Sequence, residues 1–543
     1  MIRLWNFKNH VSKLKYLFFV YFLIIVFSSL ILWSPISQVQ TETQISYIDS
    51  VFTTASAFSD TGLVVKDTFK HWNDLGQAVI AILILSGGIG IFALKFFFIN
   101  YLFGHKTSSF NEMKLLQTER GGTDNTKTTR LIISSVKFIF FNIFIFSIIL
   151  TIYFFYAEPR HTEAMKEFLK PGKDYINPQG NFLLSLKFGI FHTISAINNA
   201  GFDIISNASL MPYYQNYELQ IIFIILLIIG GIGYPAIYDI ASYIKHKYRR
   251  NKEKFRFSLF TKVSLTAYTL IFVLGFIPSI IFESSSQDPF SLWNQYYIPT
   301  NASETNVDVY VKWFKEGQNL QNIPTAIKPY IDKGYIYGSN WDKSFAVIFT
   351  TFSTRSAGFA TINLKHLTSG TTFIYIIMMV IGSAPASTGG GIRTTTAALI
   401  IMSMIRILFG LPRVRMFKRA INKDTVNMAS QILAIAVMIL IIASLILSSS
   451  FDTYGGQIHT YSQSGNANNA YTIDNIIFEV ASAFGTTGLS SGITKDLNIA
   501  SKIALILVMF IGQFGISSTL LVWKRKNNYK RTYEYVDGDF AIG

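Results

Sequence analysis

Apolar stretches without charge recur along the whole chain. Eight runs of about 20 residues contain no Asp, Glu, Lys or Arg, namely Tyr16–Thr41, Leu75–Leu94, Phe138–Ala157, Leu219–Tyr238, Val263–Phe282, Leu367–Ile392, Thr425–Phe451 and Ile503–Trp523. Because about 20 helical residues at about 1.5 Å rise cross the roughly 30 Å hydrocarbon core of a bilayer, each run predicts a membrane-spanning helix. The pattern predicts an all-α polytopic membrane protein, although polar ends interrupt the first and seventh runs and glycines interrupt the sixth.

Basic residues gather in five clusters between pairs of these runs. The clusters fall at 3–15, 106–130, 245–256, 413–419 and 524–526. Lys and Arg favour the cytoplasmic side of a membrane, and each interval between neighbouring clusters holds two runs, which is an even number of crossings. We therefore expect the N and C termini both to be cytoplasmic.

A shorter apolar segment ending in glycine lies between the two runs of every pair. These segments are Val51–Gly62, Phe188–Gly201, Phe345–Gly358 and Ile477–Gly488, and none is long enough to cross a bilayer. Non-helical backbone at membrane depth is tolerated only where it is buried in protein or faces water. The pattern predicts four repeats of helix, re-entrant pore loop and helix, in a pseudo-fourfold arrangement around one pore.

A second spacing supports the repeats. From each loop glycine to the first glycine of the next run, the steps are 62→87, 201→230, 358→382 and 488→512, or 25, 29, 24 and 24 residues. Glycines that recur at such regular spacing are typical of internal repeats. We expect repeat 1 in residues 1–103, a cytoplasmic linker and repeat 2 in 104–243, a cytoplasmic loop and repeat 3 in 244–409, and a further loop, repeat 4 and the C-terminal tail in 410–543.

The loop ends are candidate cation ligands. Backbone carbonyls around a common axis can replace the hydration shell of a monovalent cation, and glycine lets the backbone turn those carbonyls inward. The candidate selectivity filter is Asp60, Thr61, Gly62, Asn199, Ala200, Gly201, Ser356, Ala357, Gly358, Thr486, Thr487 and Gly488.

Composition narrows the class of protein. The 543 residues carry 47 Lys+Arg and 31 Asp+Glu, a net charge of +16, yet only 14% of residues are charged against about 25% in soluble proteins. Membrane topology explains the basic excess without nucleic-acid binding. No cysteine is present, which excludes disulfides and thiolate chemistry.

Two other classes are disfavoured. No phosphate-binding loop or HExxH motif occurs and the eight histidines are scattered. The sequence therefore contains no recognisable catalytic site, which disfavours a membrane enzyme. A carrier with inverted repeats is disfavoured because all four units enter from the same side.

The loop peptides resemble the filter signatures of the Ktr, Trk and HKT superfamily of potassium transporters, and most closely those of the Ktr membrane subunit. The resemblance runs from about Tyr16 to Trp523 and is carried by residues 192–196, 199–203, 353–359 and 482–485. It implies potassium uptake across the plasma membrane, with K⁺ at the filter carbonyls and no covalent cofactor. Sodium-selective HKT relatives carry serine at the first filter glycine, where this chain has Gly62. A sodium-permeable or poorly selective transporter of the same fold remains the alternative.

The resemblance also implies partners. Ktr membrane subunits are homodimers in the lipid bilayer that rest on a cytosolic ring of nucleotide-binding regulatory subunits. The basic loops are plausible contacts, whereas the outer segment 283–343 suggests no function.

The sixth run contains a glycine-rich break. Three consecutive glycines with a proline upstream cannot form a stable helix in mid-membrane. The segment resembles the intramembrane gating loop of Ktr and Trk proteins, the alternative being a simple helix break. The candidate gating residues are Ala386, Ser387, Thr388, Gly389, Gly390, Gly391 and Arg393.

Two residues depart from the resemblance. Gln513 stands where relatives usually carry an arginine that points into the pore below the filter. Arg393 either supplies that missing positive charge or anchors its helix at the cytoplasmic interface. Asp60 stands at a position that is generally uncharged, where it either concentrates cations at the outer mouth or caps the loop backbone.

Overall fold

The computed structural model describes residues 13–39, 45–90, 93–94, 97, 125–249, 255–296, 334–454, 457–460 and 472–516. The described chain is mostly helical, as predicted, with very little strand. Its strands form two short hairpins, β1 (Arg415–Met416) with β2 (Arg419–Ala420) and β3 (Phe451–Tyr454) with β4 (Gln457–Thr460).

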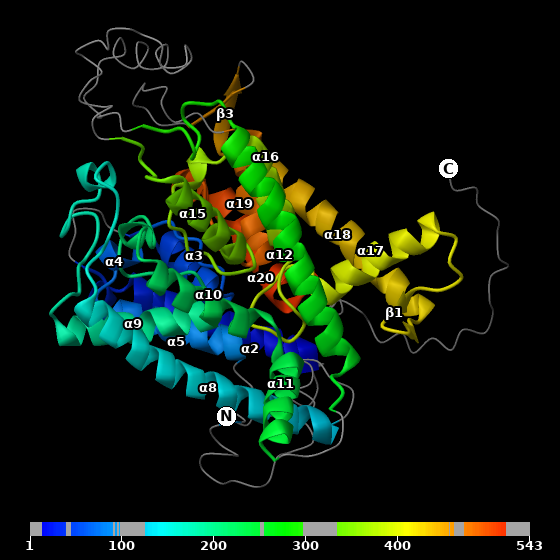
Figure 1. Cartoon of the computed structure of the whole chain (residues 1–543). Coiled ribbons are helices and arrows are strands. Elements are labelled where there is room, and N and C mark those ends of the chain that lie inside the picture. Colours follow the sequence, from blue (N-terminus) through cyan, green and yellow to red (C-terminus); the bar gives the residue numbers. More distant parts are fainter. Residues whose placement is uncertain are drawn as a thin grey trace.

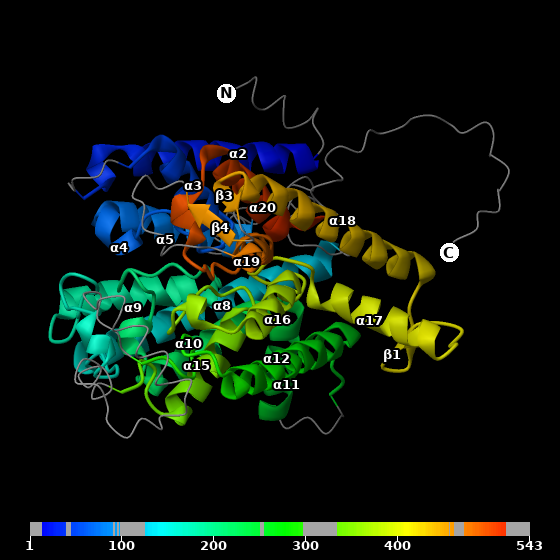
Figure 2. The ribbon, with the colours of Figure 1, turned by 90° about the horizontal axis from the view of Figure 1, so that it is seen from above.

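Four long apolar helices lie on the outside of the molecule (Figures 1 and 2). They are α2 (Lys13–Trp33), α8 (Asn125–Tyr156), α12 (Leu259–Ser285) and α18 (Lys423–Ser448). All four are long and apolar enough to cross a membrane, and only 17% to 28% of their most apolar windows is buried within the protein. An exposed apolar surface of this kind is stable when lipid covers it.

Four shorter helices are buried much more deeply, namely α3 (Tyr47–Phe58), α9 (Phe182–Ile197), α15 (Asn340–Ser353) and α19 (Ile473–Gly485). Three of them begin at a side-chain cap, because Ser46, Asn181 and Ser339 each accept a hydrogen bond from a backbone amide of the first turn. Each long helix packs on the buried helix that follows it: α2 on α3, α8 on α9, α12 on α15 and α18 on α19.

A third set of helices follows the buried set, namely α5 (Asp74–Ile89), α10 (Tyr217–Gly231), α16 (Ser369–Val380) and α20 (Ile499–Phe514). Their contacts run from each unit to the next: α5 packs on α9, α10 on α15, α16 on α19 and α20 on α3. The series therefore closes into a cycle of four helix groups.

Glycines in the third set explain the spacing seen in the sequence. A Cβ added to Gly87 would lie 1.9 Å from the carbonyl oxygen of Phe58, and one added to Gly512 would lie 2.0 Å from that of Phe484. Gly230 meets Ile197 O in the same way, at 2.2 Å. The helices approach each other too closely for any side chain, so these glycines serve packing.

Several runs are interrupted at glycine. α5 and α20 end inside their runs, at Gly90 (φ +90°) and Gly515 (φ +84°), and two further runs are broken in different ways. We predicted Leu219–Tyr238 as one span, but α10 ends at Gly231 and α11 (Tyr234–Tyr248) leaves at 106° to it, so the prediction of a continuous span was wrong. Gly233, at φ +87°, and Pro235 at the start of α11 make this break. The sixth run breaks where its glycines predicted, between α16 and α17 (Thr394–Leu408).

The remaining helical segments are short. They are α4 (Thr68–His71), η1 (Pro35–Ser37), η3 (Met165–Glu167), η4 (Met211–Tyr213), η5 (Leu364–His366) and η7 (Ile493–Asp496). The two termini, the boundary at 103/104 and most of the outer segment 283–343 lie outside the described residues.

Candidate functional site

The four loop glycines meet at one place, although more than 400 residues separate the first from the last. They have φ angles of +85° at Gly62, +70° at Gly201, +77° at Gly358 and +85° at Gly488. Such values are accessible to glycine at little cost and disfavoured for other residues. We call these four residues the glycine ring.

The glycine ring closes in sequence order. A Cβ on Gly62 would lie 3.1 Å from the Cα of Gly201, and one on Gly201 would lie 2.7 Å from the Cα of Gly358. A Cβ on Gly358 would lie 3.3 Å from the Cα of Gly488, and one on Gly488 would lie 2.9 Å from the Cα of Gly62. Each glycine of the ring therefore lies against the next one around a closed circuit.

The residue before each glycine presents its carbonyl to this circuit. Cβ atoms on the four glycines would approach carbonyl oxygens at 2.1 to 2.8 Å, those of Thr61, Ala200, Ala357 and Thr487. The amide of each of these residues is already bonded to a carbonyl near the end of its own helix, as in Thr61 N to Ser56 O at 2.9 Å. Within the described part of the chain, none of the four oxygens accepts a hydrogen bond, so they are available to a cation.

The residues two positions before the glycines, which the sequence had placed in the candidate filter, form a second ring with a backbone geometry of its own. Asp60, Asn199, Ser356 and Thr486 all have positive φ, at +51°, +57°, +69° and +47°. A left-handed residue is tolerated by Asp and Asn but is unusual for Ser and Thr, so residue type alone gave no common signal. In each of the four loops, two residues two positions apart have positive φ, so the four loops share one backbone geometry. We call these residues the inner ring.

Side chains of the inner ring reach the glycine-rich segment 382–391. The amide of Gly390 donates to Thr486 Oγ1 at 2.7 Å. A Cβ on Gly389 would lie 2.6 Å from the Cβ of Ser356. The segment therefore lies directly against the inner ring.

The same segment is fixed to three helices. Thr388 N donates to Gly230 O at 3.3 Å, and Gly391 N donates to Gly512 O at 3.2 Å. Ala386, at φ +54°, accepts a hydrogen bond from Tyr234 N at 2.8 Å. Ser387 is buried and its hydroxyl bonds back to Ala384 O. These bonds join α10, α11 and α20 to the candidate gating loop.

Arg355, which belongs to the third loop peptide 353–359, is a buried cation close to the glycine ring. Its side chain is buried, with 1% exposed, between the third filter loop and the break in α16. One guanidinium nitrogen donates to Gly382 O at 2.7 Å and the other to Ile381 O. Ser383 Oγ returns a bond to Arg355 O at 3.2 Å. Arg355 thus ties the loop of Gly358 to the residues that follow α16 and precede the candidate gating loop.

Asp60, Gln513 and Arg393 come together beneath the glycine ring. Gln513 Nε2 donates to Asp60 Oδ2 at 3.2 Å, and Arg393 donates to Gln513 O at 2.8 Å and to Gly389 O. The carboxylate of Asp60 therefore faces α20 and the candidate gating loop, and is not directed toward the cavity described below. Arg393 bonds both to this loop and to α20.

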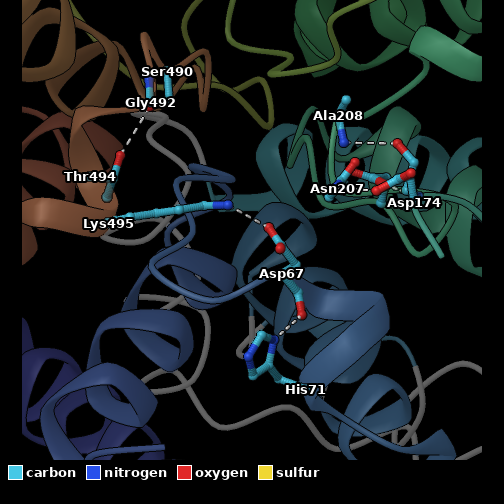
Figure 3. Close-up of polar contacts among 11 residues, drawn as sticks. Asp67, His71, Asp174, Asn207, Ala208, Ser490, Gly492, Thr494 and Lys495 are labelled. Atoms are coloured by element: carbon cyan, nitrogen blue, oxygen red, sulfur yellow. Dashed lines mark hydrogen bonds and ion pairs between the residues drawn. The ribbon is translucent and has the colours of Figure 1, made fainter. Parts of the chain in front are cut away.

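A cavity of about 470 Å³ lies on the opposite side of the glycine ring. All four glycines line it, together with residues that follow them such as Phe202 and Leu489. Lys495 Nζ, from the fourth unit, reaches across to Asp67 Oδ1 in the first at 2.9 Å (Figure 3). The ion pair links two loops at the wall of the cavity.

Two titratable groups on this wall lie outside the spanning helices. Burial raises the pKa of Asp203 to about 7, despite the hydrogen bonds it accepts from Ser206 N and Ile205 N. Burial lowers the pKa of His366 to about 4. Among the described residues, no group of three or more His, Asp or Glu side chains is placed to hold a metal ion.

Comparisons with known proteins identify relatives among cation transporters. The TrkH family, described as cation transport proteins, matches residues 20–531. The uncharacterized cation transporter MG322 of Mycoplasma genitalium is 30% identical over 575 residues, which cover 98% of this chain and 97% of the relative. Ktr system potassium uptake protein D of Bacillus subtilis is 28% identical over 499 residues, covering 92% of this chain and 90% of the relative.

A solved structure shows the same fold. The crystal structure of the potassium transporter TrkH from Vibrio parahaemolyticus matches with a TM-score of 0.54 at 16% identity, and covers 89% of this chain and 79% of that chain. At this identity the match speaks for the fold alone. The family match covers nearly the whole chain, which therefore belongs to the TrkH family of cation transport proteins, as a multi-pass membrane subunit of the Ktr/Trk superfamily and not an enzyme.

Proposed function

We propose that this chain takes up potassium through a pore whose selectivity filter is the glycine ring. The closed circuit of Gly62, Gly201, Gly358 and Gly488 is the observation that carries the proposal. A cation on the axis of this circuit would meet the carbonyl oxygens that precede the glycines. Such oxygens can replace the water shell of a monovalent ion.

The buried helices add a favourable field. In this proposal α3, α9, α15 and α19 are the pore helices of four re-entrant repeats, bounded as residues 1–103, 104–243, 244–409 and 410–543. Each helix ends three to five residues before its filter glycine. A helix C-terminus carries roughly half a negative charge, and four such ends around one axis attract a cation.

The segment Ala386–Gly391 is proposed to act as the gate. It lies against the inner ring and is held by bonds to the ends of α10 and α20. A segment that is not helical can exchange its hydrogen bonds at a lower cost in free energy than a continuous helix can. Its displacement would open the path between the filter and the cytoplasm.

The names of the relatives favour K⁺ as the transported ion. Ktr system potassium uptake proteins B and D of Bacillus subtilis are both 28% identical to this chain. A potassium/sodium uptake protein of Enterococcus hirae, NtpJ, is 25% identical, which keeps Na⁺ permeability as the alternative. By the same relationship we propose cytoplasmic termini, a plasma-membrane homodimer and control by a cytosolic ring of nucleotide-binding regulatory subunits.

Flux through the purified protein tests the proposal. The chain is reconstituted in liposomes, and uptake of K⁺, Rb⁺ and Na⁺ is measured separately against protein-free liposomes. K⁺ and Rb⁺ uptake well above Na⁺ uptake is the expected result. Equal uptake of all three would replace K⁺ selectivity with general monovalent permeability, and no uptake with correct insertion would contradict a pore.

A further inference from the structure

One member of the inner ring differs in charge from the other three. Asn199, Ser356 and Thr486 are neutral, whereas Asp60 is a carboxylate. Its side chain is fully buried, and its neighbour Gln513 is 7% exposed. A buried carboxylate is costly unless hydrogen bonds or a positive charge compensate it. The one carboxylate of the inner ring is therefore a candidate cation ligand together with Gln513 beside it.

The surroundings of Asp60 are built from three of the four units. Gln513 Nε2, from the fourth unit, donates to Asp60 Oδ2 of the first unit at 3.2 Å and to Thr388 O of the third unit at 3.0 Å. The other end of the same carboxamide, Oε1 of Gln513, is buried and has no hydrogen-bond partner among the described residues. A buried carboxamide oxygen left without a donor is a feature that calls for an explanation.

We propose that Asp60, Gln513 and the carbonyl of Thr388 form an inner binding site for a monovalent cation, directly beneath the glycine ring. The proposal rests on the proposed function, since it assigns a second binding site to the same ion path. It accounts for both unusual residues together, the acid at 60 and the neutral amide at 513.

The geometry shows how the site would accept an ion. Two oxygens, Asp60 Oδ2 and Thr388 O, converge on the point that Gln513 Nε2 now occupies. A half-turn of the carboxamide replaces this nitrogen with Oε1, so that three oxygens face one another. A cation between them takes over the role of the amide hydrogens, and carboxylate and carbonyl oxygens are the ligands that hard cations prefer.

A nearby positive charge keeps the site from holding its ion too tightly. Arg393 donates to the backbone oxygen of Gln513 and to Gly389 O, so its guanidinium adjoins the same residue from the other side. Conduction requires binding that is favourable enough for entry and weak enough for release. The carboxylate of Asp60 attracts the ion and favours entry, and the guanidinium of Arg393 repels it and favours release.

The variant Asp60→Asn tests the site. Asparagine already stands at the equivalent inner-ring position, Asn199, with a φ of +57° against +51° at Asp60, so the loop geometry should survive the change. We expect the K⁺ concentration for half-maximal uptake in liposomes to rise about three- to tenfold, because a charge close to the ion is lost and pore water screens part of its effect. Asp288→Asn, the same chemical change at an exposed residue, is the control and should leave this concentration unchanged.

A charge-relocating variant separates a local site from a general field. Asp60→Asn combined with Asn199→Asp restores one carboxylate to the inner ring, but away from Gln513. If the site is local, the half-maximal concentration stays raised in the double variant. Full recovery in the double variant would replace the three-residue site with a simple ring charge.

Direct binding gives a readout that does not depend on transport. Crystals of wild-type protein grown with RbCl should show an anomalous peak beside Asp60 in addition to any peak at the glycine ring, and Asp60→Asn crystals should lose only the former. A peak at the glycine ring alone, together with unchanged half-maximal K⁺ in Asp60→Asn, would overturn the inner site and leave the filter standing. Absence of flux and of every peak in wild-type protein would instead count against the proposed function.

Discussion

The glycine ring and the inner ring lie two residues apart in each loop and share one backbone geometry. All eight positions have φ between +47° and +85°. The glycine ring has the same residue four times, while the inner ring has Asp, Asn, Ser and Thr. At each non-glycine position of the inner ring, the positive φ strains the backbone by about 1 to 3 kcal/mol, a cost that glycine avoids.

This difference indicates two kinds of constraint. At the glycine ring a Cβ would collide with a carbonyl oxygen of the next loop, so contact between backbones excludes every other residue. At the inner ring the side chains have room to make individual bonds, as Thr486 does with Gly390 and Asp60 with Gln513. The glycine ring is therefore expected to set ion preference, and the inner ring to set gating and affinity.

The largest expected effect comes from breaking the glycine ring. Gly201→Ser is the mildest of the four possible changes, because its Cβ would lie 2.7 Å from the nearest atom, against 2.1 to 2.5 Å at the other three glycines. We expect the K⁺ over Na⁺ preference to fall tenfold or more, equivalent to about 1.4 kcal/mol of discrimination. Gly62→Ser should act in the same direction. The measurement is separate K⁺ and Na⁺ uptake in liposomes.

Gly180→Ser is the matched control for this change. Gly180 has a φ of +75°, close to the +70° of Gly201, but a Cβ there meets nothing within 4 Å. Both variants carry the same backbone strain, and only one crowds the ring. Wild-type ion preference in Gly201→Ser would show that the ring does not select the ion.

Much of the fold was predictable from the sequence because it follows from apolar run length and glycine position. Run length located all four outer helices, and the recurring glycines marked where helices touch backbone to backbone, as at Gly87 and Phe58. The break between α10 and α11 was missed because it falls inside an uncharged run, where hydropathy does not change. The turn at Gly233 depends on contacts with the distant Pro385, whose carbonyl oxygen would lie 2.6 Å from a Cβ there.

The site was predictable only in part. The filter positions followed from repetition along the chain, but the direction of Asp60 depends on Gln513, which lies 453 residues away. No local pattern encodes such a contact. The buried role of Arg355 was missed for the same reason, since its acceptors are carbonyls of the α16 break.

The next largest effect should come from separating the inner ring from the candidate gating loop. Thr486→Val keeps the shape of the side chain but leaves the amide of Gly390 without its acceptor. An orphaned buried amide costs about 1 to 3 kcal/mol, which weakens the closed arrangement. We expect basal K⁺ uptake without any regulatory partner to rise about tenfold.

Thr486→Ser is the matched control, because it retains the hydroxyl and should retain low basal uptake. Shortening residues 386–391 should raise uptake as well. If Thr486→Val inserts normally and shows unchanged or lower basal uptake, the segment has a structural role and is not a gate.

A smaller effect is expected from Gln513→Arg, which introduces the arginine that the resemblance to Ktr and Trk proteins led us to expect at this position. A guanidinium 4 to 8 Å from the ion opposes it by about 2 to 4 kcal/mol at an effective dielectric near 20, before pore water screens it. We expect Gln513→Arg to lower K⁺ flux several-fold without changing ion preference. Because Asp60 contacts residue 513, it should neutralise part of the new charge.

A double-mutant comparison sharpens this prediction. The loss of flux caused by Gln513→Arg should be larger in the Asp60→Asn background than in wild type, since neighbouring charges do not act additively. Equal flux in wild type and Gln513→Arg at matched protein density would show that this side chain does not face the ion path. Equal losses in both backgrounds would show that the two residues are not coupled.

The smallest effect concerns the cavity on the other side of the glycine ring, where Asp203 is the acid with a raised pKa. Burial raises the pKa of this side chain to about 7, and the charge of Asp67 adds to the shift. Asp203 is therefore mostly neutral at pH 6 and mostly negative at pH 8, whereas His366, with a pKa near 4, stays neutral over that range. A negative charge on a cavity wall concentrates cations, so K⁺ uptake at low K⁺ should rise about twofold from pH 6 to pH 8. At saturating K⁺ the rise should disappear, because entry no longer limits the rate.

Asp203→Asn removes the titrating group, and its uptake should be flat over this pH range. The same pH dependence in Asp203→Asn as in wild type would show that another titrating group, and not Asp203, causes the effect.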